Sequence, residues 1–391
     1  MRLTVPVLTV MAVLVGCSGG DPQTAEPVVR DSAGIRIVEN GNTSNLPAIH
    51  VTDPDLRLEL GSAGEDTTQL LYQVEGAHVL SDGRIVVANR GSHELRYYSA
   101  EGRFLHAAGR KGAGPGEFDY LTWSLQCGAD TVFAYDIGLR RAQLFDEQGR
   151  FARGFLGQLP DGGAPYGAAQ CWQGTFSVLA WGEGGRQLGY HRPPQPLMTV
   201  DADWHLIAHV DTLAGTERWG HEYGSRPAYF GKTPAHTIGP GGIYAGSADT
   251  YELRRFAPEG RLLTIIRWRG TALAVTGAHV ARLEALEREA ARRQGNAATT
   301  ERALAEAVYP DSVPAYQRFL MALTGELWVQ DYQPPGDSVQ WWTVFDQDGV
   351  ALRRVELPSG LYAFEIGPDY VVGRARDALD VEHVRVYRLG V

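Results

Sequence analysis

Lysine is almost absent from this 391-residue sequence, in which only Lys111 and Lys232 carry a lysine side chain. Nearly all cationic side chains are therefore arginines, and the 46 aspartates and glutamates outnumber the 36 lysines and arginines. The formal net charge is −10. Because nucleic acids and anionic membrane surfaces attract positively charged proteins, this balance argues against both as binding partners.

Cysteine is also scarce, with three in the whole chain. The motifs C-x-x-C and H-E-x-x-H do not occur, which removes the usual signals of a dithiol oxidoreductase and of a zinc hydrolase. Cys127 and Cys171 each follow a glutamine and precede a strand-like run. They could form a disulfide or remain two buried thiols, because sequence spacing does not show whether their Cβ atoms lie within bonding reach.

The N-terminus, "MRLTVPVLTVMAVLVGCSGG", has one arginine and then a short apolar core, as in a secretory signal. That core is shorter than the roughly 20 apolar residues of a membrane-spanning helix. The end of the core, "LVGC", is similar to the lipobox of bacterial lipoproteins. The resemblance implies cleavage before Cys17, acylation of its thiol, a signal peptide over residues 1–16 and a tether over 17–33. Ser18 favours the outer membrane if the cell is Gram-negative, and an ordinary signal peptide is the alternative.

The remaining chain reads as repeated groups of strands. The clearest copy is "GAHVLSDGRIVVANRGSHELRYYSAEGRFLHAAGRKGAGPGEF". Its Asp-Gly and Glu-Gly pairs predict hairpin turns, because glycine accepts the positive φ of such turns. The spacing of the turns suits four-stranded propeller blades of about 40 to 45 residues. Looser copies cover residues 130–155, 174–210, 241–268, 325–357 and 362–389.

The last copy ends after its third strand, whereas the segment Thr52–Glu65 has the pattern of a final strand with no blade of its own. Pairing the two would remove both open edges of a ring of blades. We therefore predict an all-β fold over residues 34–391, a six-bladed propeller closed by Leu56–Leu60 in the last blade. Five or seven blades remain alternatives because the third copy is loose.

The first copy resembles an NHL-type propeller repeat. From Asp31 onward, including "DSAGIRIVEN" and "FEIGPDYVVGRARDALDVEHVRVYRL", the chain resembles the bacterial 6-bladed β-propeller lipoproteins. The resemblance implies the fold and a place in the cell envelope. It implies no chemistry, because that family has no defined activity.

The glycine-rich stretch "GRKGAGPGEF" looks at first like a phosphate-binding loop. A loop of that kind needs Ser or Thr after its lysine and a helix after the loop. Here no Ser or Thr follows Lys111, and the next segment reads as a strand. We interpret the stretch as a connector between blades.

A long insertion between the fourth and fifth blades, residues 276–309, has helical spacing. Thr276 is a candidate N-cap, and Val280, Leu283 and Leu286 repeat at helical intervals. The helices could cover one end of the propeller or dock a partner. Alternatively, they pack on its rim.

Candidate ligands for the centre of the ring come from the first strand of each blade. His78 and His236 fall at similar places in the first and fourth blades, which face each other in a six-bladed ring, and Glu75 and Glu365 lie in nearby strands. Three other blades offer only apolar residues there, so no metal site is assigned. A divalent ion such as calcium or zinc is an alternative, and no other cofactor is predicted. The apolar residues are Leu125, Ala169 and Leu320.

A second candidate site is the segment Trp219–His236, read as a loop before the fourth blade. Its aromatic and basic residues could stack on a sugar or hold a carboxylate, as a small-ligand sensor would, or they could pack against one another. The residues are Trp219, His221, Tyr223, Arg226, Tyr229 and Lys232.

The favoured function is a monomeric, non-enzymatic binding or scaffolding module, held to the membrane by its lipid and presented to a protein, peptide or glycan of the envelope. The alternative is a metal-dependent hydrolase or lyase, lactonase-like or NHL-type, with its site in the centre of the ring. A propeller fold does not decide between them.

Overall fold

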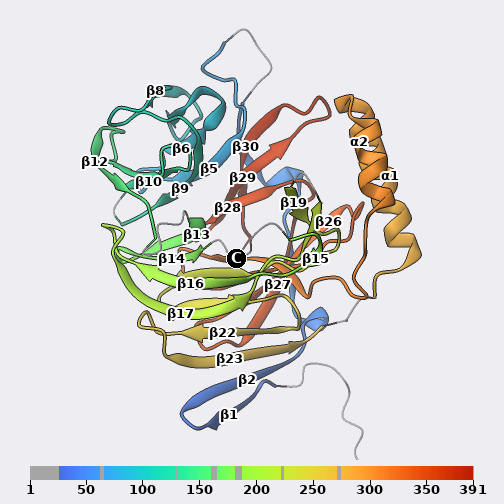
Figure 1. The fold of residues 1–391 in the computed structure, drawn as a ribbon. Helices are drawn as coiled ribbons and strands as arrows, with labels where there is room; N and C mark the ends of the chain where they lie inside the picture. The colour runs from blue at the N-terminus through green and yellow to red at the C-terminus, as the bar shows by residue number, and fades with distance from the viewer. Residues whose placement is uncertain are drawn as a thin grey trace, which may run out of the picture.

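The computed structural model of the chain describes residues 26–61, 66–128, 130–159, 165–180, 187–221, 224–270 and 274–390. Most of these residues lie in antiparallel β-sheets (Figure 1). Parts of the sequence predictions fall outside the described ranges: the signal peptide with Cys17 and the first part of the tether (residues 1–25), the end of the segment Thr52–Glu65, and Tyr223.

The first three large sheets each contain four strands in chain order. The first comprises β5 (Val74–Val79), β6 (Ile85–Asn89), β7 (Glu94–Tyr98) and β8 (Phe104–Ala108). The second comprises β9 (Leu121–Gln126), β10 (Val132–Asp136), β11 (Arg141–Phe145) and β12 (Phe151–Leu156). The third comprises β13 (Pro165–Trp172), β14 (Thr175–Ala180), β16 (Pro194–Val200) and β17 (Leu206–Ala214).

The next three sheets recruit strands from the N-terminal segment. The fourth comprises β20 (Ala235–Gly239), β21 (Gly242–Gly246), β22 (Glu252–Phe256) and β23 (Leu262–Arg269), extended by β2 (Ile35–Asn42) and β1 (Val28–Ser32). The fifth comprises β24 (Tyr316–Met321), β25 (Leu327–Asp331), β26 (Val339–Phe345) and β27 (Ala351–Pro358), extended by β3 (Ala48–His50). The sixth comprises β28 (Tyr362–Ile366), β29 (Tyr370–Arg376), β30 (Glu382–Arg388) and β4 (Leu56–Leu60).

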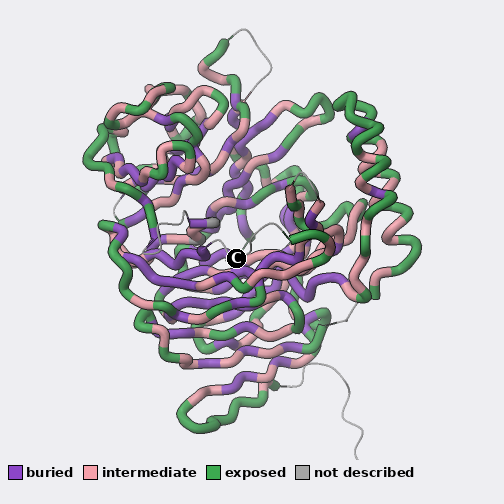
Figure 2. Tube along the Cα trace, viewed as in Figure 1, coloured by how far each residue is buried: buried purple, intermediate pink, exposed green. Residues whose placement is uncertain are grey.

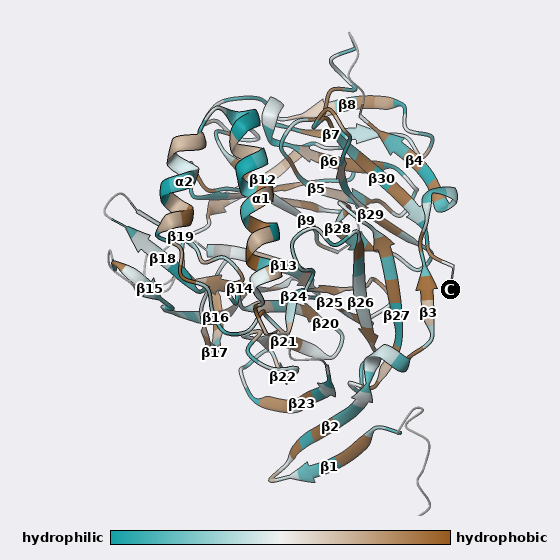
Figure 3. Cartoon of the chain, turned by 90° about the vertical axis from the view of Figure 1, so that its right-hand side faces the viewer, coloured by the Kyte–Doolittle hydropathy of each residue, from teal (hydrophilic) through white to brown (hydrophobic). Residues whose placement is uncertain are grey.

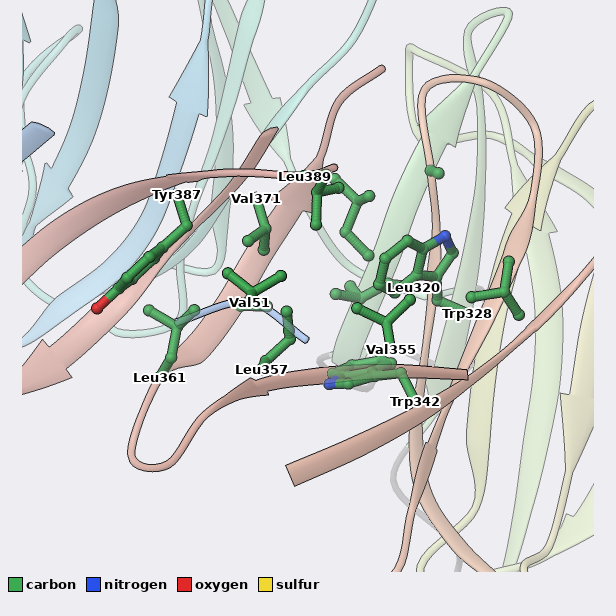
Figure 4. Close-up of a cluster of buried hydrophobic side chains, with 14 of the residues drawn as sticks. Val51, Leu320, Trp328, Trp342, Val355, Leu357, Leu361, Val371, Tyr387 and Leu389 are labelled. Carbon is green, nitrogen blue, oxygen red and sulfur yellow. The ribbon is translucent and has the colours of Figure 1, made fainter. Parts of the chain in front are cut away.

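The six sheets form a closed circle. Their first strands, which we call the inner strands, contact one another in the order β5, β9, β13, β20, β24 and β28, and β28 contacts β5. Buried apolar side chains fill the space between each sheet and the next, as Figure 4 shows for Trp342, Val355 and Tyr387 between the fifth and sixth sheets. The cluster containing Leu60 and Val74 joins the sixth sheet to the first. The fold is therefore all-β and propeller-like.

The predicted pairing of the N-terminal strand with the last repeat is present. β4 has the predicted bounds and pairs antiparallel with β30, where Leu60 lies opposite Val384 and Leu58 opposite Val386. By contrast, β1 lies inside the segment 17–33 that we predicted as a tether. It pairs with β2, although all five of its residues are exposed (Figure 2).

The predicted hairpin turns also have the expected geometry. Gly83 adopts a φ of 85° and donates its backbone N–H to the Leu80 carbonyl at 2.9 Å. A left-handed φ of this size is strained for residues with a Cβ, which explains why an Asp-Gly pair occupies the turn.

The insertion forms α1 (Gly277–Gln294) and α2 (Ala297–Ala305), which lie side by side between β23 and β24 in the chain (Figure 3). As predicted, Thr276 caps α1, and its hydroxyl accepts the His279 backbone N–H at 3.2 Å. No helix in the described ranges is long and apolar enough to cross a membrane.

Cys127 and Cys171 form a disulfide, with 5.2 Å between their Cα atoms and a separation of 44 positions in sequence. The bridge joins the end of β9 to β13 within a buried cluster that includes Phe133 and Trp204. Of the two alternatives for these cysteines, the structure contains the disulfide.

Candidate functional site

His78 lies on β5 and connects three neighbouring inner strands. Its Nδ1 is 3.3 Å from Oε2 of Glu365 on β28, and its Nε2 is 3.0 Å from Oγ of Ser124 on β9. All three side chains are buried. An N–H on Nδ1 can donate to the Glu365 carboxylate, whereas Nε2 faces both the Ser124 hydroxyl and, at 3.1 Å, the Ser124 backbone carbonyl, which can only accept.

Glu365 has two further donors, because its Oε1 accepts the Tyr370 hydroxyl at 2.7 Å and the Val79 backbone N–H at 3.0 Å. Burial, together with the nearby Glu365 carboxylate, raises the pKa of Tyr370, so its hydroxyl remains a donor. A carboxylate, a histidine and a serine follow one another here in the order used by serine hydrolases. However, Ser124 is only 3 % exposed, so a substrate carbonyl could not reach its hydroxyl in this conformation.

The other candidate histidine has different partners. His236 lies on β20, where its Nδ1 is 3.0 Å from the Ser177 hydroxyl of β14. Burial lowers the pKa of His236 to about 4. The imidazole is therefore neutral at pH 7 and acts as one member of a hydrogen-bonded pair.

Replacing His236 should change how stability depends on pH. The folded-state pKa of about 4 is below the ordinary value of 6.5, so the unfolded chain binds the extra proton between these values. The contribution of the neutral His236 to the free energy of unfolding is fully present above pH 6.5. It falls by up to about 3 kcal/mol as the pH drops towards 4. The free energy of unfolding, measured with urea at several pH values between 4 and 7, should depend less steeply on pH in His236→Gln than in the native sequence. His209, which is exposed on β17, serves as the control, since His209→Gln should leave the dependence of stability on pH unchanged. An unaltered dependence in His236→Gln would contradict the assignment.

Glu75, the fourth predicted ligand, is not paired with either histidine. Its Oε1 lies 2.7 Å from Nη1 of Arg90, in the turn between β6 and β7. Burial raises the pKa of the Glu75 carboxyl, although the charge of Arg90 opposes this rise. The Arg90 guanidinium also lies over the ring of Tyr120, 4.6 Å from its centroid.

The chain of contacts continues around the ring from Glu75. Arg374 on β29 donates from Nη1 to the carbonyl of Val74 at 2.7 Å, next to Glu75. Arg374 also lies 5.3 Å from the ring centroid of Tyr362, its cross-strand neighbour on β28. Arg318 on β24 lies over the same ring at 4.0 Å. We call this set the Tyr–Arg arc; it comprises Tyr120, Arg90, Glu75, Arg374, Tyr362 and Arg318.

Aromatic side chains of the arc reach solvent. Tyr120 is 49 % exposed and Tyr362 is 47 % exposed. Tyr72, which is 60 % exposed, packs against the turn that carries Arg90, where a Cβ at Gly91 would lie 2.6 Å from its ring. Four neighbouring sheets thus contribute to one group of exposed tyrosines and partly buried arginines. Of these residues, only Glu75 was a candidate site residue in the sequence.

The segment Trp219–His236 is not a loop, which corrects the sequence interpretation. It contains β18 (Arg218–His221), β19 (Gly224–Pro227) and the start of β20, and the first two strands form a small sheet with β15 (Gly189–His191). Trp219 lies opposite Tyr190 on β15 and opposite Arg226 on β19. His221 lies at the end of β18.

The basic residues of this segment contact the protein itself. Arg226 donates from Nη2 to the Ala303 carbonyl of α2 at 2.9 Å and lies over the Tyr229 ring at 4.4 Å. Lys232 lies 3.7 Å from the buried Glu217 carboxylate. This hairpin therefore packs against the helical insertion (Figure 3), and its two basic side chains have partners in α2 and Glu217.

A metal-ligand cluster is not assembled among the residues that the structure describes, where no three His, Cys, Asp or Glu side chains could hold one ion. Of the four candidate ligands, only His78 and Glu365 contact each other.

No protein-family model matches this sequence, and no curated protein matches it. Among solved structures, the chain is similar to a member of the duf4221 family from Bacteroides vulgatus, with a TM-score of 0.50 and 9% identity over 85% of this chain and 96% of that one. A "Putative exported protein" from Bacteroides fragilis has a TM-score of 0.49 and 14% identity, covering 91% and 100% of the two chains. Regucalcin from Agrobacterium tumefaciens, a calcium-binding protein, has a TM-score of 0.42 and 11% identity, covering 88% and 96%. At these identities, the likeness to the duf4221 member shows a shared fold and assigns no ligand or reaction to this chain.

Proposed function

We propose that this protein is an exported, lipid-anchored six-bladed β-propeller that binds a protein, peptide or glycan partner in the cell envelope. The six large sheets are its blades, β4 closes the last blade, and α1 and α2 are inserted between the fourth and fifth blades. Acylated Cys17 is its membrane anchor, in the outer membrane if the cell is Gram-negative.

The Tyr–Arg arc is the main observation that supports the binding role in this proposal. Tyrosine and arginine are enriched at protein interfaces and among the residues whose truncation costs most binding energy. Here they come from four neighbouring blades and two of the rings are about half exposed. A rigid ring of blades would hold these side chains in place before a partner arrives, which lowers the entropy lost on binding.

A hydrolase is the second candidate function, because Glu365, His78 and Ser124 follow one another at 3.3 Å and 3.0 Å. The burial of Ser124 favours a different role for these residues, which is to join the inner strands of three adjacent blades. Labelling of Ser124 by a fluorophosphonate probe would support the hydrolase instead.

The anchor and the binding face can be tested together in intact cells. A photo-crosslinking residue at Tyr120 should give a defined adduct, and Arg90→Ala should reduce its yield at least fivefold, because Arg90 lies over the Tyr120 ring. The same residue at Leu352, exposed on β27 in the fifth sheet, is the control and should give no such adduct. Cys17→Ser should move the protein from the membrane to the soluble fraction. Equal adducts from both positions would contradict the binding face, and an unchanged membrane fraction would contradict the anchor.

A further inference from the structure

Two guanidinium groups share one aromatic ring near the start of the sixth blade. The Cζ atoms of Arg318 and Arg374 lie 4.0 Å and 5.3 Å from the ring centroid of Tyr362. The three residues come from β24, β29 and β28, and β24 contacts β28 directly. Two positive charges therefore lie beside the same ring in a protein whose net charge is −10.

The two arginines differ in how their charge is balanced. Arg374 lies 3.8 Å from the carboxylate of the buried Glu382. Arg318 donates from Nη2 to the Ala363 carbonyl at 2.9 Å and faces the rings of Tyr362 and Trp342. In the described part of the chain, no carboxylate lies within 4 Å of its guanidinium.

Arg318 is enclosed by protein although it keeps partial contact with solvent. Burial lowers the pKa of Arg318; the charge of Arg374 adds to this effect, while Tyr362 opposes it. An arginine remains charged even so. An enclosed charge without a counter-ion destabilises the protein, and a bound anion would remove that cost.

We propose that Arg318 and Arg374, together with Tyr362, bind an oxyanion group of the ligand, either a carboxylate or a phosphate. The planar guanidinium group matches both oxyanions because its parallel N–H bonds can meet two oxygen atoms at once. The carbonyls of Ala363 and Val74 hold one N–H of each arginine and so fix the orientation of the remaining donors. The inference deepens the proposed binding role and rests on it for its biological meaning.

The experiment uses the mature chain as Cys17→Ser and compares sodium phosphate, sodium acetate and sodium chloride at equal ionic strength. Either phosphate or acetate should raise the Tm by about 3 °C at one hundred times its Kd, as expected for a ligand that binds only the folded chain. Chloride should have no such effect. The anion that gives the larger shift identifies the ligand group as a phosphate or a carboxylate.

Arg318→Gln and Arg374→Gln should each abolish the anion-dependent shift. Arg57→Gln is the matched control and should retain it, since Arg57 is a partly exposed arginine paired with Asp369 at 2.7 Å. If Arg318→Gln does not fold, Arg318→Lys keeps the charge without the planar fork and should bind at least tenfold more weakly.

Two results would overturn the site. One is an unchanged Tm of the Cys17→Ser chain in both oxyanions, which would leave Arg318 a purely structural contact of Tyr362. The other is an anion-dependent rise in Tm that persists in both Arg318→Gln and Arg374→Gln, or full affinity for the anion in Arg318→Lys. Neither result depends on the crosslinks from Tyr120, so failure of the oxyanion site and failure of the binding face can be distinguished.

Discussion

A chain that begins at residue 62 should lose its cooperative thermal unfolding transition and aggregate. This truncation removes β1, β2 and β3 from the fourth and fifth sheets and β4 from the sixth. Without β4, β30 becomes an unpaired edge and the cluster around Leu60, Leu71 and Val384 opens to water. A chain that begins at residue 34 is the control, because it lacks only β1, whose side chains are all exposed. In calorimetry, the chain that begins at residue 34 should unfold close to the temperature of the full-length protein. The chain that begins at residue 62 should show no such transition.

Point substitutions within β4 should distinguish the loss of its pairing with β30 from the effect of shortening the chain. Leu60 is 1 % exposed and Leu56 is 36 % exposed. Leu60→Asp should lower the free energy of unfolding by at least about 3 kcal/mol, because it removes a buried side chain and buries a charge. Leu56→Asp, on the same strand, should cost about 1 kcal/mol or less. Similar losses for the two variants would mean that β4 does not close the ring.

The pairing of β4 was predictable because two signals in the sequence agreed. The last repeat lacked a strand, and Leu56–Leu60 had the turn, strand and glycine of that strand without a repeat of its own. Both signals depend on local pattern, which sequence displays directly. The N-terminal cap of α1 was predictable for the same reason.

The Tyr–Arg arc was not predictable, and β-bulges are part of the reason. The pairing register shifts between Val74 and Gly76 on β5, between Tyr316 and Arg318 on β24, and between Ala363 and Glu365 on β28. Each shift changes which face of the sheet the following side chains occupy. A strict alternation read from the sequence therefore does not show on which face Glu75 or Arg318 lies.

The segment Trp219–His236 was misread for a different reason. Its composition was consistent with a ligand-binding loop, but Arg226 uses its guanidinium on the Ala303 carbonyl, which lies 77 residues further along the chain. The helical insertion that supplies this carbonyl was visible in the sequence, whereas the direction in which it folds back was not. Long-range contacts of this kind decide whether a polar segment is free to bind.

Replacing both disulfide cysteines, as Cys127→Ala with Cys171→Ala, should have the second large effect. Closing a loop across 44 residues restricts the unfolded chain, and the loop-entropy estimate for its removal is about 4 kcal/mol. Urea unfolding without reductant should therefore show a much lower midpoint for the double variant. Adding reductant should lower the midpoint of the native sequence towards that of the variant and leave the variant itself unchanged.

The same measurement tests the proposed location of the protein. Disulfides persist in exported proteins and are rare in the reducing cytosol. The sulfur atoms lie in a cluster with Phe133 and Trp204 between the second and third sheets, so the bridge also fixes how these two sheets pack. Two results would contradict the bridge. One is free thiols at both positions in protein isolated from the cell envelope. The other is an equal urea midpoint for the native sequence and the double variant without reductant. The proposed export would then rest on the N-terminal segment alone.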